Sequence, residues 1–90
     1  MKPRPCFVYV LGACGQAGAK EMRTYVGWSN NLDARLAKHN AGTGAKSTRG
    51  RQWHLLYVEM FLTRGEAMSR EWYLKRDRKL RKNLINNWAM

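Results

Sequence analysis

The chain has 90 residues, enough for one domain (1–90, core about 6–85) with a single small core and no large internal cavity. Seventeen Lys and Arg against six Asp and Glu give a formal net charge of +11, which exceeds what solubility requires and favours nucleic acid over an anionic membrane surface as the partner. No apolar run approaches the roughly 20 residues that span a bilayer, and the basic N-terminus is a poor signal peptide, so we expect a protein of the cytoplasm or nucleoid with no membrane partner.

Two β-rich stretches open the chain, Cys6 to Leu11 and Met22 to Gly27, with a loop from Gly12 to Lys20 between them. Their β-branched and aromatic residues predict the two strands of a hairpin. Each stretch carries one tyrosine, Tyr9 and Tyr25, and both can face the same side of the hairpin. The two cysteines of the chain match neither a disulfide framework nor a zinc-site spacing.

The next elements are a helix and a third strand. The run Ser29 to Asp33 is typical of a helix start, with Ser29 or Asn30 as the cap. This helix is expected to end near Asn40 to Gly44. The segment Trp53 to Leu62 is rich in aromatic and aliphatic residues and predicts the third strand.

A capping box at Thr63 to Glu66 predicts the start of a long helix that runs to about Arg81. The segment Asn83 to Met90 is then a short tail, with one more helical turn as an option. The expected fold is therefore α+β, with a three-stranded antiparallel sheet flanked by helices in the order strand, strand, helix, strand, helix and an optional final helix.

Polar residues lie on the inner faces of both predicted helices. Arg35 and His39 fall on one broad face together with the leucines of the first helix, so they border the buried stripe and are aimed at the sheet. Glu71 falls inside the face of the long helix that should pack on the sheet, where a carboxylate needs a partner. By itself Glu71 fits an ordinary helix-surface ion pair with Lys75 or Arg78.

These residues stand in the order and approximate spacing of a known family. The matching elements are Phe7-Val8-Tyr9, Tyr25-Val26-Gly27, Asn31-Leu32, Arg35, His39, the run Gly42 to Thr48 with Gly44-Ala45-Lys46, and Glu71. The chain resembles the GIY-YIG endonuclease family, and most closely its small single-domain bacterial members, the YhbQ-like group. It departs from the family in Phe7, which replaces the first glycine, in Ser47, which stands where an aromatic residue is common, and in a longer hairpin loop.

The resemblance implies a role for each residue of the catalytic set. Glu71 would be the sole protein ligand of Mg²⁺ or Mn²⁺, hard ions that keep much of their water. Tyr9 would be the base, favoured as a phenolate by neighbouring cations, and Tyr25 would orient water or phosphate. Arg35 would clamp the scissile phosphate, and His39 would relay a proton from Tyr9 or hold the phosphate. Without the resemblance, the tyrosines are ordinary sheet residues and His39 is a helix C-terminal histidine.

Two further residues are candidates for substrate binding. Lys46 lies on a loop whose glycines permit close approach of a backbone to DNA, although a solvated loop lysine has the same appearance. Asn83 stands near the place of a late asparagine in the family.

The predicted function is a divalent-metal-dependent endonuclease that hydrolyses DNA, with RNA left open, in repair or recombination. The basic residues from Arg49 to Lys82 suit phosphate backbones, and Trp28 or Trp53 can stack on an unpaired base. Because no base-reading motif is evident, we expect cleavage selective for branched, flapped or single-stranded DNA, with a partner protein as a further source of specificity. The alternative is a non-catalytic nucleic-acid-binding module of the same fold.

Overall fold

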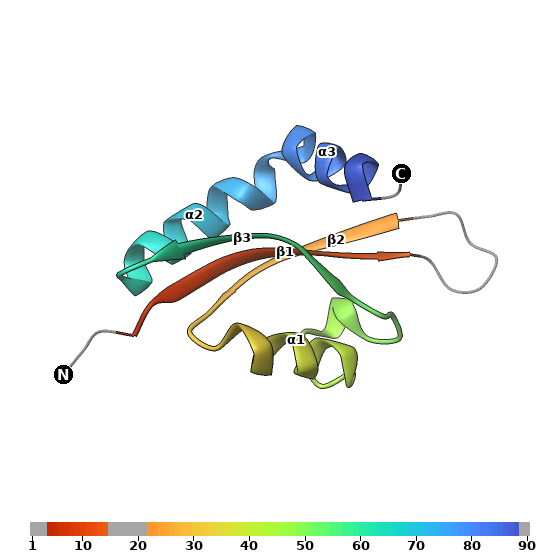
Figure 1. Ribbon diagram of the computed structural model, residues 1–90, viewed down its shortest axis with the longest axis horizontal. Coiled ribbons are helices and arrows are strands. Elements are labelled where there is room, and N and C mark those ends of the chain that lie inside the picture. Colours follow the sequence, from red (N-terminus) through yellow and green to blue (C-terminus); the bar gives the residue numbers. More distant parts are fainter. Residues whose placement is uncertain (1–3, 15–21, 89–90) are drawn as a thin grey trace.

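The computed structural model describes residues 4–14 and 22–88 and has a three-stranded antiparallel sheet at its centre (Figure 1). The strands are β1 (Cys6–Cys14), β2 (Met22–Ser29) and β3 (His54–Phe61), in the spatial order β2-β1-β3. This confirms the predicted sheet. β1 continues through the first three residues of the predicted loop, and the rest of that loop, 15–20, lies outside the described residues.

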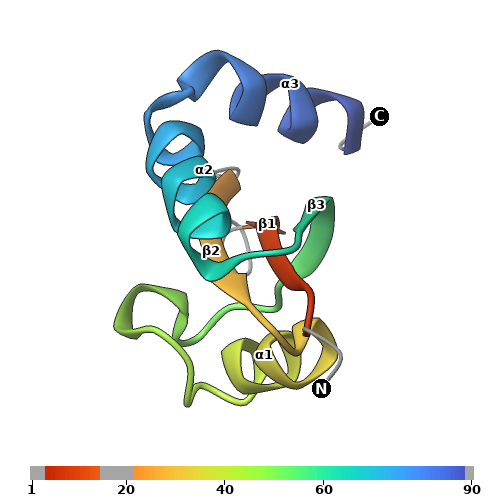
Figure 2. The same cartoon turned by 90° about the vertical axis from the view of Figure 1, so that its left-hand side faces the viewer.

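Helices cover both faces of the sheet (Figures 1 and 2). On one face lies α1 (Leu32–Asn40), followed by the short 3-10 helix η1 (Lys46–Thr48). On the other face lie α2 (Arg64–Arg76) and α3 (Arg78–Trp88). None of the helices in the described part of the chain has the length and apolar character needed to cross a membrane.

The helix ends follow from local capping. The capping box is confirmed, because Thr63 Oγ1 accepts from the Glu66 backbone and donates to the Glu66 carboxylate at 2.8 Å. The predicted cap of α1 is wrong: β2 extends through Ser29, and it is Asn31 whose side chain accepts from the Ala34 N–H. The single long helix is also wrong, because Asp77 leaves the helical conformation and its carboxylate accepts from Leu80 N, starting α3.

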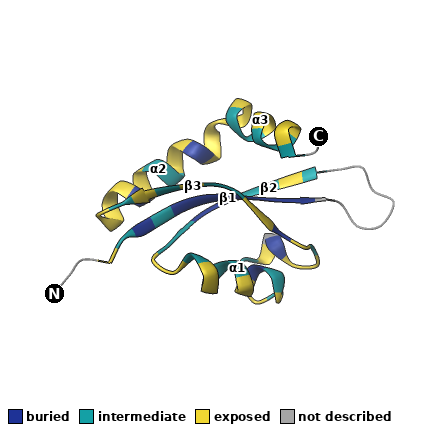
Figure 3. Cartoon of the chain, viewed as in Figure 1, coloured by how far each residue is buried: buried dark blue, intermediate teal, exposed yellow. Residues whose placement is uncertain are grey.

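β1 is the central strand, and its alternate side chains enter two separate cores. Val8 and Val10 pack with Ala67 and Leu74 of α2, and Tyr9 faces the α1 side in a group with Leu11, Ala13 and Trp53. Figure 3 shows β1 as the most continuously buried element, between helices with exposed outer surfaces. The sheet therefore carries one residue set toward α1 and the other toward α2.

Candidate active site

Tyr9, Tyr25 and His39 meet between the sheet and α1. The Tyr9 hydroxyl lies 3.0 Å from His39 Nε2, and both side chains are buried. The Tyr25 ring centroid lies 4.7 Å from that of His39 and 6.4 Å from that of Tyr9. Both tyrosines face the same side of the hairpin, as predicted, and the histidine of α1 packs against them.

Two glycines make these approaches possible. A Cβ at Gly27 would lie 2.6 Å from the Tyr9 hydroxyl oxygen, and a Cβ at Gly44 would lie 2.6 Å from His39 Nδ1. Both distances are shorter than side-chain carbons tolerate. The glycine that ends the second tripeptide is thus required for space, since Tyr9 is paired directly with Gly27 across β1 and β2.

The second ring nitrogen of His39 also has a partner. His39 Nδ1 lies 2.9 Å from Thr48 Oγ1, and the Thr48 hydroxyl donates to the Ala45 carbonyl at 2.8 Å. Thr48 is fully buried, and its own carbonyl accepts from the Trp53 indole N–H at 2.7 Å. The turn after α1 is therefore packed and hydrogen-bonded onto the outer edge of the imidazole.

Arg35 lies one helical turn before His39 and adds a positive charge. The nearby Tyr9 hydroxyl and, to a smaller degree, Tyr25 raise the pKa of the Arg35 guanidinium above its ordinary value, against the opposing effect of burial. Arg35 Nε is buried and has no hydrogen-bond partner among the described residues. A buried donor of this kind is expected to have a partner, and an oxygen of a bound anion would supply one.

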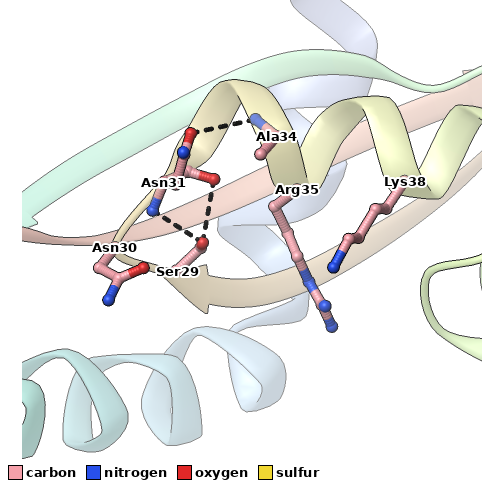
Figure 4. A pocket seen from close by; sticks show the side chains of 6 residues that line it. All are labelled: Ser29, Asn30, Asn31, Ala34, Arg35 and Lys38. Carbon is pink, nitrogen blue, oxygen red and sulfur yellow. Dashed lines mark hydrogen bonds between the residues drawn. The ribbon is translucent and has the colours of Figure 1, made fainter.

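Two shallow hollows open beside Arg35. One, of about 290 Å³, is lined by Trp28, Ser29, Asn30 and Arg35. The other, in which Arg35 and Lys38 extend in the same direction from α1, is shown in Figure 4. Trp28 packs against the core on the α2 side, whereas Arg35 comes from α1, so the first hollow joins the two faces around the edge strand β2.

Burial controls the protonation of the central pair. It raises the pKa of Tyr9 to about 12, with smaller upward effects from Tyr25 and Glu71 and a downward effect from Arg35. Burial, followed by the charge of Arg35, lowers the pKa of His39. Both shifts favour the neutral form of the group. Arg35 favours the phenolate of Tyr9, as expected, but desolvation outweighs this one guanidinium, so Tyr9 is a neutral phenol before substrate and metal bind.

Glu71 comes from α2, on the other side of the sheet, and its charge is close enough to Tyr9 to raise the pKa of that phenol. Its carboxylate lies 3.7 Å from the ammonium of Lys75, an exposed i,i+4 partner. No group of three or more His, Cys, Asp or Glu side chains with metal-site geometry occurs within 4–14 and 22–88. A single accessible carboxylate fits a hard, largely hydrated cation and does not fit zinc.

Among the described residues, neither predicted substrate residue makes a side-chain hydrogen bond with this group. Lys46 begins η1 and is exposed, two residues before the buried Thr48. Asn83 is exposed on α3, and no hydrogen bond or ring contact of the described residues connects it with the tyrosines. The proposal that Trp53 stacks on a base is wrong, because Trp53 is 2% exposed and precedes β3 as part of the core.

Two features of the structure, the contact of Thr48 with His39 and the exposure of Trp72, were not predicted from the sequence. Thr48 contacts His39, but a threonine in a polar turn gives no signal of burial. Trp72 of α2 is 51% exposed, and the Arg76 guanidinium lies 3.5 Å above its ring. The only hint of a role for Trp72 in the sequence was that it directly follows Glu71.

Comparison with known proteins places these residues in a family. Residues 7–86 match the model of the GIY-YIG catalytic domain. A UPF0213 protein of Clostridium perfringens is 45% identical over 71 residues, covering 78% of this chain and 70% of that protein. A UPF0213 protein of Staphylococcus aureus is 46% identical over 79 residues, covering 83% and 89%.

A solution NMR structure of a UPF0213 protein from Bacillus halodurans is 32% identical, covers 91% of this chain and 83% of that chain, and superposes with a TM-score of 0.48. The family model spans both tripeptides, α1, the turn with Thr48, and the helices that carry Glu71 and Asn83. This chain belongs to the GIY-YIG catalytic domain family, and its relatives include the small bacterial UPF0213 proteins.

Proposed function

We propose that this protein is a divalent-metal-dependent endonuclease that hydrolyses DNA phosphodiester bonds and selects branched, flapped or single-stranded DNA. Membership in the GIY-YIG catalytic domain family indicates nuclease chemistry in general. The observation that carries the proposal is the buried pair of the Tyr9 hydroxyl and His39 Nε2, 3.0 Å apart, with a guanidinium beside it that has an unpaired buried N–H.

Arg35 is the proposed phosphate clamp. Its charge persists at any physiological pH, and its planar guanidinium can donate two parallel hydrogen bonds to phosphate oxygens. The buried Nε without a partner supports this role, since a phosphate seated in the adjoining hollow would satisfy it. Lys38, which lines the neighbouring hollow, would add charge for the next phosphate along the strand.

Tyr9 and His39 are the proposed base pair for the attacking water. The water oxygen bonds to phosphorus as the bond from phosphorus to the 3′-oxygen breaks, and the departing oxygen takes a proton from solvent. The water proton passes to the Tyr9 oxygen while the tyrosine proton passes to His39 Nε2, which becomes an imidazolium and later loses the proton. A phenol with a pKa of about 12 therefore need not ionise before the reaction begins.

Glu71 is the proposed ligand for the divalent cation, with Tyr25 orienting the water or the phosphate. A cation bound there would supply positive charge at the leaving 3′-oxygen. The Lys75 side chain that pairs with Glu71 is 53% exposed, so its ammonium can leave the carboxylate for solvent or a phosphate at little cost.

The preference for unpaired strands is supported by a surface row on α2. Met68, Trp72 and Arg76 recur every four residues, so they lie along one face of the helix, in the row adjacent to Glu71 and Lys75. Met68 and Trp72 are about half exposed. This α2 aromatic row joins a cation to an aromatic ring next to the proposed metal ligand, a combination that binds single strands by stacking and charge.

The test is incubation of the purified protein with end-labelled linear duplex, single-stranded, flapped and four-way-junction DNA, and with RNA of the same sequence. Each substrate is assayed with Mg²⁺, with Mn²⁺ and with EDTA. We expect cleavage near the unpaired or branched region with either metal and none with EDTA. Tight, salt-sensitive binding with no cleavage in any lane would favour the binding module instead.

A further inference from the structure

Thr48 is a buried polar residue whose hydrogen bonds run in one direction only. The Ala45 carbonyl oxygen, 2.8 Å from Thr48 Oγ1, can only accept, so the single hydroxyl proton of Thr48 is directed to it. Thr48 Oγ1 therefore acts as an acceptor toward His39 Nδ1, 2.9 Å away. The imidazole must carry a proton on Nδ1 to make this bond.

The proton on Nδ1 also determines the state of the other ring nitrogen. A neutral imidazole has one proton, so His39 Nε2 carries a lone pair, and the Tyr9 hydroxyl donates to it across 3.0 Å. The hydrogen bonds then run from Tyr9 to His39 and from His39 through Thr48 to the Ala45 carbonyl. In the opposite tautomer, the proton would lie on Nε2 and face the Tyr9 hydroxyl. Nδ1 would then have no proton to donate to the Thr48 oxygen.

Thr48 is held in place by independent contacts. Its backbone N–H donates to the Ala45 carbonyl at 3.1 Å, and its carbonyl accepts from the Trp53 indole at 2.7 Å. Gly44 leaves no side-chain atoms between the turn and the imidazole, since a Cβ there would collide with His39 Nδ1. The hydroxyl is thus fixed opposite Nδ1 and shielded from water.

We propose that Thr48 is a positioning residue that holds His39 in the Nδ1-protonated tautomer, so that Nε2 is free to take the proton of Tyr9. The consequence for catalysis rests on the proposed nuclease function, whereas the tautomer itself does not. The other histidine of the chain, His54, is exposed, and no side-chain hydrogen bond to its ring occurs among residues 4–14 and 22–88, so it serves as an internal reference.

The tautomer can be measured directly by long-range ¹H–¹⁵N NMR on protein labelled with ¹⁵N-histidine. The His54→Gln variant assigns the His39 signals. We expect a pyrrole-type Nδ1 and a pyridine-type Nε2 in the wild type and in Thr48→Ser, which keeps the hydroxyl. Thr48→Val removes only the hydroxyl at equal size, and we expect a mixture of tautomers or the Nε2-protonated form.

The amide spectrum of each variant reports whether the fold is retained. Should the valine variant fail to fold, the wild-type and serine spectra still decide the assignment. A wild-type His39 protonated on Nε2, or a folded Thr48→Val with an unchanged tautomer, would overturn the proposal.

The catalytic consequence has its own readout. We expect Thr48→Val to lower kcat by about 10- to 100-fold, the loss found when hydrogen-bond partners of metal-binding histidines are removed. KM for DNA should change less than about twofold, because Thr48 does not face the substrate, and Thr48→Ser should restore kcat. An unchanged kcat in a folded valine variant would contradict the positioning role. Absence of cleavage by the wild type would refute the proposed function, and the NMR result would then stand by itself.

Discussion

Gly27 gives the Tyr9 hydroxyl the space it occupies. The two residues are direct partners across β1 and β2, and a Cβ on Gly27 would lie 2.6 Å from the hydroxyl oxygen and 2.8 Å from the ring carbon that bears it. Tyr9 cannot retreat, because it is 1% exposed and its hydroxyl bonds to His39. The hydrogen bond between Tyr9 and His39 therefore depends on the absence of a side chain at Gly27.

We expect Gly27→Ala to displace the Tyr9 hydroxyl from His39, lower stability by about 1 to 3 kcal/mol through overpacking, and reduce cleavage more than binding. Gly65→Ala is the matched control, since a Cβ at Gly65 has no described atom within 4 Å beyond its chain neighbours and the backbone of α2, and alanine favours the first turn of that helix. Urea unfolding measures the stability of both variants, and single-turnover cleavage measures their activity. Equal stability and activity in the two would show that the Tyr9 site tolerates the methyl group.

The strands and the strand–helix order were predictable, but the role of β1 was not. Its sequence lacks a clean alternation because helices cover both faces, with Val8 directed to α2 and Tyr9 to α1. The break at Asp77 was missed for a similar reason. Its sequence neighbours are arginines, and no Gly or Pro marks a helix end there. An aspartate that caps α3 cannot be distinguished in the sequence from any helix-surface acid, and only the structure shows its carboxylate accepting from Leu80 N.

At the site, the candidate residues came from the resemblance to a known family, whereas their contacts could not be predicted. The Tyr9 to His39 hydrogen bond depends on the register of β1 and β2 and on the angle of α1, which no local pattern encodes. Trp53 illustrates the ambiguity of an aromatic residue in a basic chain: it was predicted as a strand residue able to stack on a base, and it is buried with its indole N–H on Thr48.

Replacement of Glu71 by Gln should reduce cleavage to background while DNA binding stays equal or becomes tighter, because it removes the metal ligand and a repulsive charge together. Glu66→Gln is the control carboxylate, since Glu66 acts in the capping box at the start of α2. Cleavage assays with Mg²⁺ and Mn²⁺ and binding assays in EDTA separate the two effects. A purified Glu71→Gln protein that cleaves normally would remove Glu71 from the metal site.

The α2 aromatic row predicts that loss of a stacking residue and loss of a charge affect DNA binding differently. Trp72→Ala should weaken binding of single-stranded DNA by about 1 to 3 kcal/mol, leave duplex binding almost unchanged, and preserve the steep salt dependence. Lys79→Ala, which removes an exposed cation on α3, should instead lower the salt slope by about one for both substrates. Fluorescence anisotropy at several salt concentrations gives both quantities. Salt-independent binding by the wild type would argue against nucleic acid as the partner.

His39 should make the protein less stable in mild acid. Its folded pKa lies below the value of about 6.5 for an unfolded histidine, so between the two values the unfolded chain binds the proton more tightly. Stability is therefore unaffected above pH 6.5 and falls as the pH decreases toward the folded pKa. Urea unfolding between pH 7 and pH 5 should show this fall in the wild type and in His54→Gln, and a weaker fall in His39→Gln. The same dependence of unfolding free energy on pH in all three proteins would show that the pKa of His39 is not lowered by folding.

Tyr9→Phe tests the proposed proton transfer most directly, because it keeps the ring in the core and removes only the hydroxyl that meets His39. The variant should fold, and its turnover should fall by about 10² to 10⁴. Tyr25→Phe should have a smaller effect if Tyr25 only orients water or phosphate. In the wild type, cleavage should decline in acid as His39 is protonated, at a pH below the ordinary histidine pKa. Residual cleavage by Tyr9→Phe should lack this decline, since His39 no longer receives the proton. A larger loss in Tyr25→Phe, or the same acid decline in Tyr9→Phe, would assign the base to a group other than the Tyr9 and His39 pair.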